Sequence, residues 1–437
     1  MFLLLIVASA LFDVFSSSLR LGKDMSMSTV FKFPSVIRRQ HDGPLGIHID
    51  AYEALLQEEG YSRRPTYVHL HVVADFSRWL KRKRLAADHI GEQTVKRYLQ
   101  CRRRFGERYR GASSVPYKFL GMLRDQGIIN HKTPAVPADA CKMAVADFER
   151  YLSKERGLSA ATQCNYLPFA HQFLRERFGR GSLRFSELRG SDITGFIQRH
   201  AHKRSPRSAQ KIVGSLRAFL RYLRYRGEIS TDFAACVPTV ANFSYSSWPR
   251  FLQPGQVQQV LDHCNRHSDL GRRNYAILLL LARLGLRACE VVAMTLDDID
   301  WKAGHLTVRG KGGQRAQMPL SAELGRAIAA YLKNGRPRCA SRRLFIREHA
   351  PRVGFANSAA VSTLVQRALA DAGVDSPHTG AHVFRHSLAT EMLKHGASLG
   401  EIGQLLRHAH PDTTQIYAKV DVCALRPLAL RWPGGKQ

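Results

Sequence analysis

The sequence is poor in acidic residues. Its 437 residues include 35 aspartates and glutamates against 66 lysines and arginines, which gives a formal net charge of +31. Solubility does not require so large an excess, and it indicates a polyanionic partner such as nucleic acid. An anionic membrane surface would attract the same charge, but the basic residues are spread along the whole chain rather than gathered on one amphipathic helix. We therefore expect a nucleic-acid partner and no membrane partner.

Paired cysteines are also missing. Eight cysteines are scattered through the chain, and no two of them form a C-x-x-C pair. This spacing argues against a zinc site and against a disulfide framework, and it is typical of reduced thiols in the cytoplasm. A G-x-x-x-x-G-K-[ST] loop, which would cradle the phosphates of a nucleotide, is absent too. We expect a cytoplasmic protein without a metal site.

The apolar N-terminal stretch MFLLLIVASALFDVF resembles the apolar region of a secretory signal peptide, followed by a small-residue site. However, no lysine or arginine precedes it, and Asp13 interrupts it. Residues 1–44 are predicted to be a leader or a disordered segment, with Met25 or Met27 as alternative starts.

Proline-bearing segments divide the rest of the chain. The segments at 132–138 and 236–254 have no clear helical period, while the regions around them have apolar residues at helical spacing. We expect an N-terminal helical module at 45–131, a second helical module at 139–237, a C-terminal domain at 250–425 and a tail at 426–437. A chain of this length can form several separate cores.

The two helical modules share a pattern. Residues 62–76 resemble 159–173, and apolar positions around 95–99 and 119–127 recur about 100 residues later. A duplication explains this pattern most simply. Chance likeness between helical bundles of similar size is the alternative.

Four segments of the C-terminal domain contain residues suited to phosphate chemistry. An apolar helix is predicted from Tyr275 to about Ala282, with a break at Gly285 and a second helix opening at Arg287. Short alternating runs flank the glycine-rich tip of a predicted hairpin that carries Lys311. The remaining two segments are HTGAHVFRHSLATEML and LLRHAHPDTTQIYAKV, which contain His382, Arg385, His408 and Tyr417.

These residue types suit attack on a phosphodiester. Arginine forks can grip two phosphate oxygens and stabilise the charge that develops on them. A lysine or histidine can give a proton to the leaving 5'-oxygen. A tyrosine nucleophile, Tyr417, would keep the bond energy in a phosphotyrosine, so rejoining would need no nucleotide cofactor and no metal.

The segments resemble the catalytic domain of tyrosine recombinases, the phage-integrase family. The family pattern is G-L-R-x-x-E, a hairpin lysine, H-x-x-R-H, G-H and T-Q-I-Y, and its parts occur in order between residues 250 and 425. The resemblance implies that Tyr417 forms a 3'-phosphotyrosyl link and that two further residues, Glu290 and His386, support the site. The other implied catalytic residues are Arg287, Lys311, His382, Arg385 and His408.

The resemblance also implies the fold class and the partners. The fold would be mainly α, with a small β-sheet or hairpin in the catalytic domain and a helical core-binding domain before it. The basic run of that domain would face the DNA backbone with Arg199, Lys203, Arg204, Arg207 and Lys211. Double-stranded DNA would be bound by a homo-oligomer, a tetramer in this family, with other recombinases as further partners of a mobile element.

The chain departs from the family pattern at two places. Arg407 stands where glycine usually precedes the histidine, and Val383 and Phe384 replace a more common pair. We expect neither departure to touch a catalytic role. A type IB topoisomerase, or a DNA-binding protein with a relic site, remains the alternative function.

Overall fold

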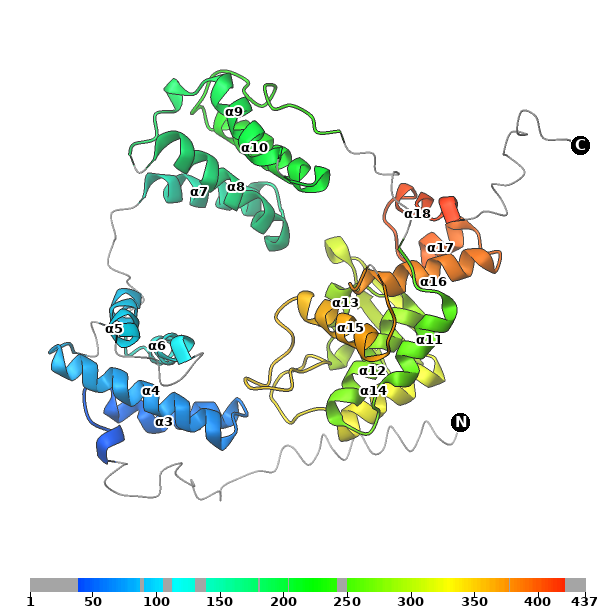
Figure 1. The fold of residues 1–437 in the computed structure, drawn as a ribbon, viewed down its shortest axis with the longest axis horizontal. Helices are drawn as coiled ribbons and strands as arrows, with labels where there is room; N and C mark the ends of the chain where they lie inside the picture. Colours follow the sequence, from blue (N-terminus) through cyan, green and yellow to red (C-terminus); the bar gives the residue numbers. More distant parts are fainter. Residues whose placement is uncertain are drawn as a thin grey trace, which may run out of the picture. The chain divides into compact units, whose positions relative to one another are not determined.

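The computed structural model describes residues 38–86, 90–104, 112–129, 139–179, 181–202, 204–241, 250–376 and 378–420 (Figure 1). The predicted leader up to residue 37, the linker at 132–138, Lys203 and the tail at 426–437 lie outside these residues. Contacts divide the chain into two units. One unit is His131–Ser246, and the other contains Met1–Asn130 together with Ser247–Gln437.

The N-terminal module is a small helical bundle. Its elements are η1 (Gly46–His48), α3 (Ile49–Glu58), α4 (Arg63–Arg82), α5 (Glu92–Arg104), η3 (Ala112–Ser114) and α6 (Val115–Asp125). Residues before the predicted boundary at 45 already pack against α4, since Asp42 accepts a 2.6 Å hydrogen bond from Lys81 and its carbonyl oxygen accepts one from Ser77 at 2.9 Å. Ordered structure therefore begins before that boundary.

The second module has the same order of helices. Its elements are α7 (Ala140–Arg150), the π-helical turn η4 (Tyr151–Glu155), α8 (Ala160–Phe178), η5 (Phe185–Glu187), α9 (Gly190–Ala201) and α10 (Pro206–Tyr225). Each module buries a hydrophobic cluster of its own. Most of their stability comes from this burial, because isolated helices of these lengths are marginal in water.

Aromatic contacts recur at matching places in the two modules. The first and last helices meet edge to face through Tyr52 and Phe119, with ring centroids 5.0 Å apart, and through Phe148 and Phe219, 5.1 Å apart. The long helices α4 and α8 both begin after a serine with extended backbone. Both modules therefore have a similar internal packing.

The π-helical turn η4 marks a difference between the modules. Tyr52 and Phe148 are 96 positions apart, whereas the serines that precede the next helices, Ser62 and Ser159, are 97 apart. A π turn accommodates one extra residue within a helix. The additional residue of the second module thus falls where its first helix changes from α to π geometry.

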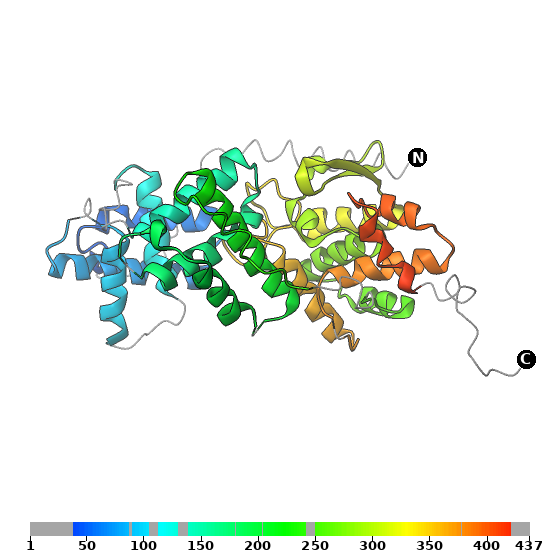
Figure 2. The same cartoon turned by 90° about the horizontal axis from the view of Figure 1, so that it is seen from above.

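The C-terminal domain begins with helices α11 (Pro254–His263), α12 (Asp269–Leu284) and α13 (Ala288–Ala293), followed by η6 (Leu296–Asp298). The strands β1 (Ile299–Asp300), β2 (His305–Arg309) and β3 (Arg315–Pro319) form an antiparallel sheet in the order β1-β2-β3, with η7 (Lys311–Gly313) at the tip between β2 and β3 (yellow-green in Figure 2). The remaining elements are α14 (Ala322–Asn334), α15 (Ala359–Asp371), α16 (His382–Lys394), α17 (Leu399–Leu405), α18 (Asp412–Gln415) and η8 (Ala418–Val420).

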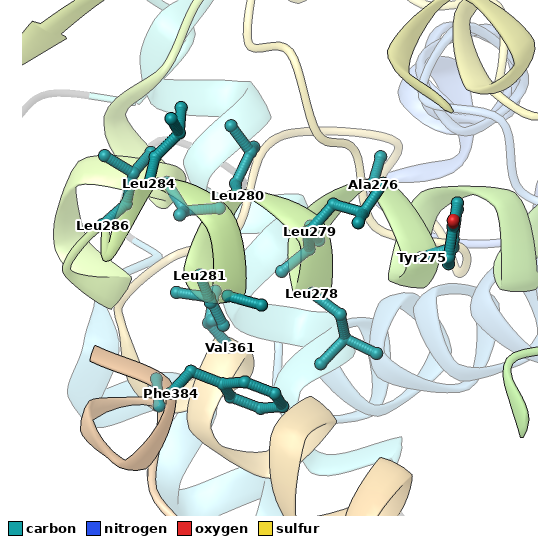
Figure 3. Packing of buried hydrophobic residues seen from close by; sticks show 14 of the residues in the cluster. Tyr275, Ala276, Leu278, Leu279, Leu280, Leu281, Leu284, Leu286, Val361 and Phe384 are labelled. Carbon is teal, nitrogen blue, oxygen red and sulfur yellow. The ribbon is translucent and has the colours of Figure 1, made fainter. Parts of the chain in front are cut away.

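Helix α12 forms the centre of this domain. Its leucines are buried on several sides, and Leu281 lies close to Val361 and Phe384 in Figure 3. The helix begins at Asp269, earlier than the predicted start at Tyr275, because the Ser268 hydroxyl accepts a hydrogen bond from the backbone of Gly271. It ends as predicted, since Gly285 takes the left-handed conformation with φ 56°.

Within the described residues, no helix combines the length and the apolar character needed to span a bilayer.

Candidate active site

Arg287 directly precedes the first turn of α13, as its glycine-containing context predicted. Its Nη1 donates to Oε1 of Glu290 at 2.8 Å, and its backbone N–H donates to Oε2 at 2.8 Å. The Glu290 side chain is only 1% exposed, so this carboxylate is held in a fixed position. The supporting role predicted for Glu290 agrees with this geometry, because it orients the arginine and leaves part of the guanidinium for another ligand.

Arg385 joins two loops of the site. It lies in the first turn of α16 and is 3% exposed. Its Nη1 donates to the Gly285 carbonyl at 2.5 Å, and its Nη2 donates to the Leu406 carbonyl. The loop before Arg287 and the loop before His408 are therefore tied to one guanidinium, which has donors left for a phosphate.

His408 is half-buried and faces a threonine. Its Nδ1 lies 2.7 Å from Oγ1 of Thr414, which is buried at the end of α18. One ring nitrogen is thus occupied, so the ring is oriented and the other nitrogen can face a substrate.

Tyr417 is buried beside a histidine. Its side chain is 1% exposed, and its hydroxyl lies 2.9 Å from Nδ1 of His386, on α16. The two rings are tilted by 57°, with centroids 5.7 Å apart. The nucleophile candidate therefore has one hydrogen-bonded neighbour, supplied by the H-x-x-R-H segment.

Burial shifts the titration of these groups. It lowers the pKa of His386 to about 4, with smaller contributions from His382 and Arg385. Burial also lowers the pKa of His408 to about 4 and raises that of Tyr417 to about 12, although nearby Arg385 and Arg287 oppose the rise for the phenol. Both histidines are neutral at pH 7, and the tyrosine is protonated.

The pKa of Arg385 is also below its ordinary value. Burial, and then the neighbouring Arg287 and Arg407, lower the pKa of Arg385 to about 10. Several cations thus stand close together around a single buried carboxylate, Glu290. An anion placed among them would relieve this repulsion, so the site favours a phosphate.

Lys311 and His382 complete the predicted set. Lys311 opens the turn η7 between β2 and β3, where Gly312 and Gly313 both have positive φ. This location matches the predicted hairpin tip. His382 is the first residue of α16 and is exposed, and its ring centroid lies 6.4 Å from that of His386.

Comparisons with known proteins identify the family of this chain. The phage integrase family matches residues 250–422. The y4rA protein of Sinorhizobium fredii, named as an integrase/recombinase, is 44% identical over 92% of this chain and 98% of its own length. The chain belongs to the phage integrase family. It is a site-specific recombinase of the tyrosine type, and tyrosine recombinase XerD of Listeria innocua is 31% identical to it over 64% of this chain and 95% of that protein.

A solved structure has the same fold. The XerH site-specific recombinase in its post-cleavage complex matches 77% of this chain and 94% of its own chain, with a TM-score of 0.52 and 18% identity. The mainly helical class with a small sheet, predicted for the recombinase from its sequence, is confirmed.

Four of the five predicted DNA-facing residues of the recombinase are described by the structure, and they lie in the second module, on and between α9 and α10. Arg207 and Lys211 are exposed on α10, and Arg204 lies over the Phe169 ring at 5.8 Å. Arg199 is exposed too, and its Nη2 lies 3.5 Å from Oε2 of Glu176. These four residues are on the surface of their module, as contact with a phosphate backbone requires.

Arg407, one of the two departures from the family pattern, contacts the supporting residue Glu290. Its Nη2 donates to Oε2 of Glu290 at 3.0 Å, and the expectation that this departure leaves the catalytic roles untouched stays a prediction. Thr414, which holds His408, was not singled out from the sequence. Its place within the T-T-Q-I-Y segment is a local signal, whereas nothing local connects Arg407 with a glutamate 117 positions away.

In the parts of the chain that the structure describes, seven cysteines are free, and no three histidine, cysteine or acidic side chains gather as a metal site would require.

Proposed function

We propose that the recombinase cuts one DNA strand with Tyr417 as the nucleophile. The phenol oxygen attacks the scissile phosphorus and passes its proton to the neutral His386 ring beside it, and the bond to the 5'-oxygen breaks. The DNA then carries a 3'-phosphotyrosyl link, and the 5'-hydroxyl leaves with a proton. Attack of a 5'-hydroxyl on the same phosphorus reverses these steps and rejoins a strand without a nucleotide or a metal.

The other residues divide the remaining work. Arg287 and Arg385 grip the non-bridging oxygens, where negative charge grows in the transition state. His408 donates a hydrogen bond to the same phosphate from the nitrogen that does not face Thr414. Lys311, on the hairpin tip, gives the proton to the leaving 5'-oxygen, and His382 helps to activate the scissile phosphate.

One observation supports this proposal above the others. The Tyr417 hydroxyl lies 2.9 Å from the His386 ring. His386 directly follows Arg385 on α16, and the Arg385 guanidinium donates to the Gly285 carbonyl, two positions before Arg287. These contacts support the assignment of the nucleophile candidate and the phosphate-binding candidates to one site.

We also propose that the recombinase binds double-stranded DNA as a homo-oligomer, a tetramer on two sites. The net charge of +31 supports a DNA partner, and the XerH structure of the same fold is described as bound to its palindromic difH substrate. In this proposal the second module contacts the backbone with Arg199, Lys203, Arg204, Arg207 and Lys211. The enzyme would serve a mobile element in the cytoplasm.

The domain division is part of the proposal. Separate hydrophobic clusters within 45–129 and 141–237 support two helical modules, and the repeated aromatic contacts support their origin by duplication. A larger cluster from Leu252 to Phe384 supports a catalytic domain at 250–425.

Covalent trapping tests the proposal. The protein is incubated with nicked suicide DNA that carries the flanks of its own gene, and the products are separated on a denaturing gel. Wild-type protein should form a slower band, and Tyr417→Phe should lose that band while binding the DNA with unchanged affinity. Equal trapping by Tyr417→Phe would show that another residue is the nucleophile, and no trapping on any flank would count against an active enzyme at these sites.

A further inference from the structure

Arg407 has a backbone conformation that disfavours its own side chain. Among the residues that the structure describes, only Arg84 and Arg407 combine a side chain with positive φ, at 54° and 55°. Glycine takes this conformation freely, whereas the Cβ of any other residue is strained against the backbone in it. Such an outlier beside an active site raises the question of what the side chain contributes in return.

The side chain of Arg407 points inward and is held at several points. It is 12% exposed. Nη2 donates to Oε2 of Glu290 at 3.0 Å, and Nη1 donates to the Leu405 carbonyl at 3.0 Å. The sulfur of Met318, on β3, is 3.2 Å from Nη1. The guanidinium thus lies between the sheet, the loop before His408 and the carboxylate that orients Arg287.

Glu290 consequently serves two arginines. Its Oε1 accepts from the Arg287 side chain, while Oε2 accepts from the Arg287 backbone and from Arg407. A carboxylate with contacts at both oxygens cannot rotate without breaking one of them. The position of Arg287 is therefore coupled to the presence of Arg407.

We propose that Arg407 is a positioning residue for the cleavage reaction. It fixes Glu290, and through it Arg287, relative to the loop that carries His408. Arg385 joins the same two loops through the Gly285 and Leu406 carbonyls. Arg385 and Arg407 thus connect the two loops at different points. The distance between the catalytic groups on these loops, Arg287 and His408, is therefore set before DNA binds.

Three variants test this role on full-length protein with nicked suicide DNA. Arg407→Gly removes the side chain and suits the left-handed backbone. Arg407→Asn also tolerates that backbone, and Arg407→Lys keeps the charge but not the fork. Arg84→Gly is the matched control, because it relieves the same conformation at an exposed residue of the N-terminal module.

The Arg407 variants should cleave DNA more slowly but bind it nearly as tightly as the wild type. We expect Arg407→Gly and Arg407→Asn to form the covalent complex about 10- to 100-fold more slowly, as a misplaced catalytic group does. Their affinity for the same DNA should stay within about threefold of the wild type, since few phosphate contacts change. Arg407→Lys should recover part of the rate, and Arg84→Gly should equal the wild type. Folded Arg407→Gly protein that cleaves at the wild-type rate would overturn the proposal.

A double-mutant cycle with Glu290→Gln separates positioning from direct contact with DNA. If Arg407 acts through Glu290, the double variant should cleave no more slowly than the slower single variant. Rate losses that multiply would overturn the proposal. The inference rests on cleavage by Tyr417. A wild-type protein that traps no DNA would therefore count against the proposed function, whereas trapping with an unimpaired Arg407→Gly counts against the inference alone.

Discussion

The hydroxyl of Tyr417 lies 2.9 Å from Nδ1 of His386, and both rings are largely buried. This pair joins the last motif of the chain to the H-x-x-R-H segment on α16. Because burial lowers the pKa of His386 to about 4, the ring is neutral at pH 7. A neutral ring can share the phenol proton without carrying a charge into the core.

Removal of the His386 ring should slow cleavage. His386→Ala leaves a buried hydroxyl without its partner, which costs about 1–3 kcal/mol and frees the Tyr417 ring to turn. We expect the rate of covalent trapping to fall about 10- to 100-fold, since this energy appears in the placement of the nucleophile. His395→Ala is the control, because His395 is exposed at the end of the same helix and its Nδ1 lies 2.8 Å from the Glu391 carbonyl oxygen. Equal rates for both variants would contradict a role for His386.

Lowering the pH should reduce the local stability of the site before it unfolds the rest of the domain. The folded pKa of His386 and of His408 is about 4, below the ordinary value of 6.5. Between these values the unfolded chain binds more protons than the folded one, so stability is full above about pH 6.5 and falls as the pH approaches 4. Hydrogen exchange of α16 amides at pH 7.5 and 5.5, corrected for intrinsic rates, measures this loss. His386→Asn should show a smaller difference between the two pH values, and an equal difference would assign the loss to other groups.

Salt should weaken DNA binding steeply, and the second module should supply part of the slope. Arg207→Ala and Lys211→Ala each remove one proposed phosphate contact, so the slope of log K against log salt should become shallower by about 1. Arg150→Ala is the control within the same module, because this exposed arginine already pairs with Asp147 at 2.9 Å. Fluorescence anisotropy across a salt series checks the prediction. If Arg207→Ala and Lys211→Ala have the same slope as the control, these two residues do not contact the DNA backbone.

Local patterns were sufficient for the parts of the site that adjoin one another in the chain. The break at Gly285 and the start of a helix after Arg287 follow from helix-ending chemistry, and the hairpin tip at Lys311 follows from its glycines. The early start of α12 was not predicted, because its first turn is polar and depends on the Ser268 cap.

Contacts between distant segments were harder to predict. His386 and Tyr417 are 31 positions apart, and Arg407 and Glu290 are 117 apart. Such pairs depend on the packing of α13, α16 and the loop after α17, and no periodicity within one segment indicates that packing. The family resemblance placed both members of the first pair in the site, but it gave no reason to place Arg407 there.

Neutralising Glu290 should destabilise the catalytic domain. Glu290→Gln keeps the shape of the side chain but leaves Arg287 and Arg407 without a buried counter-charge. Breaking a buried ion pair in this way lowers the free energy of unfolding by about 3–5 kcal/mol. Hydrogen exchange of the buried α12 amides measures the change. Glu323→Gln is the matched control, since Glu323 forms a half-exposed pair with Arg283 at 3.2 Å and should cost at most about 1 kcal/mol. Similar losses of stability in both variants would show that the buried ion pairs of Glu290 contribute no more than an exposed pair does.

A methyl group at Gly285 should disturb the site through packing as well as through the backbone. Gly285 has φ 56°, and an added Cβ would lie 2.7 Å from Cδ2 of Leu406 and 3.2 Å from Cδ2 of Leu388. Gly285→Ala should therefore displace the carbonyl that Arg385 holds, and we expect slower trapping together with a lower melting temperature.

Gly373→Ala separates the two causes. Gly373 has φ 66°, but an added Cβ would meet nothing within 4 Å. Gly373→Ala should lower the stability of the domain only by the backbone strain, about 1 kcal/mol. It should keep the wild-type rate of trapping. If Gly285→Ala lowers the melting temperature no more than Gly373→Ala does and cleaves normally, the Leu406 loop can shift without consequence, and the close spacing of Gly285, Arg385 and Leu406 does not control cleavage.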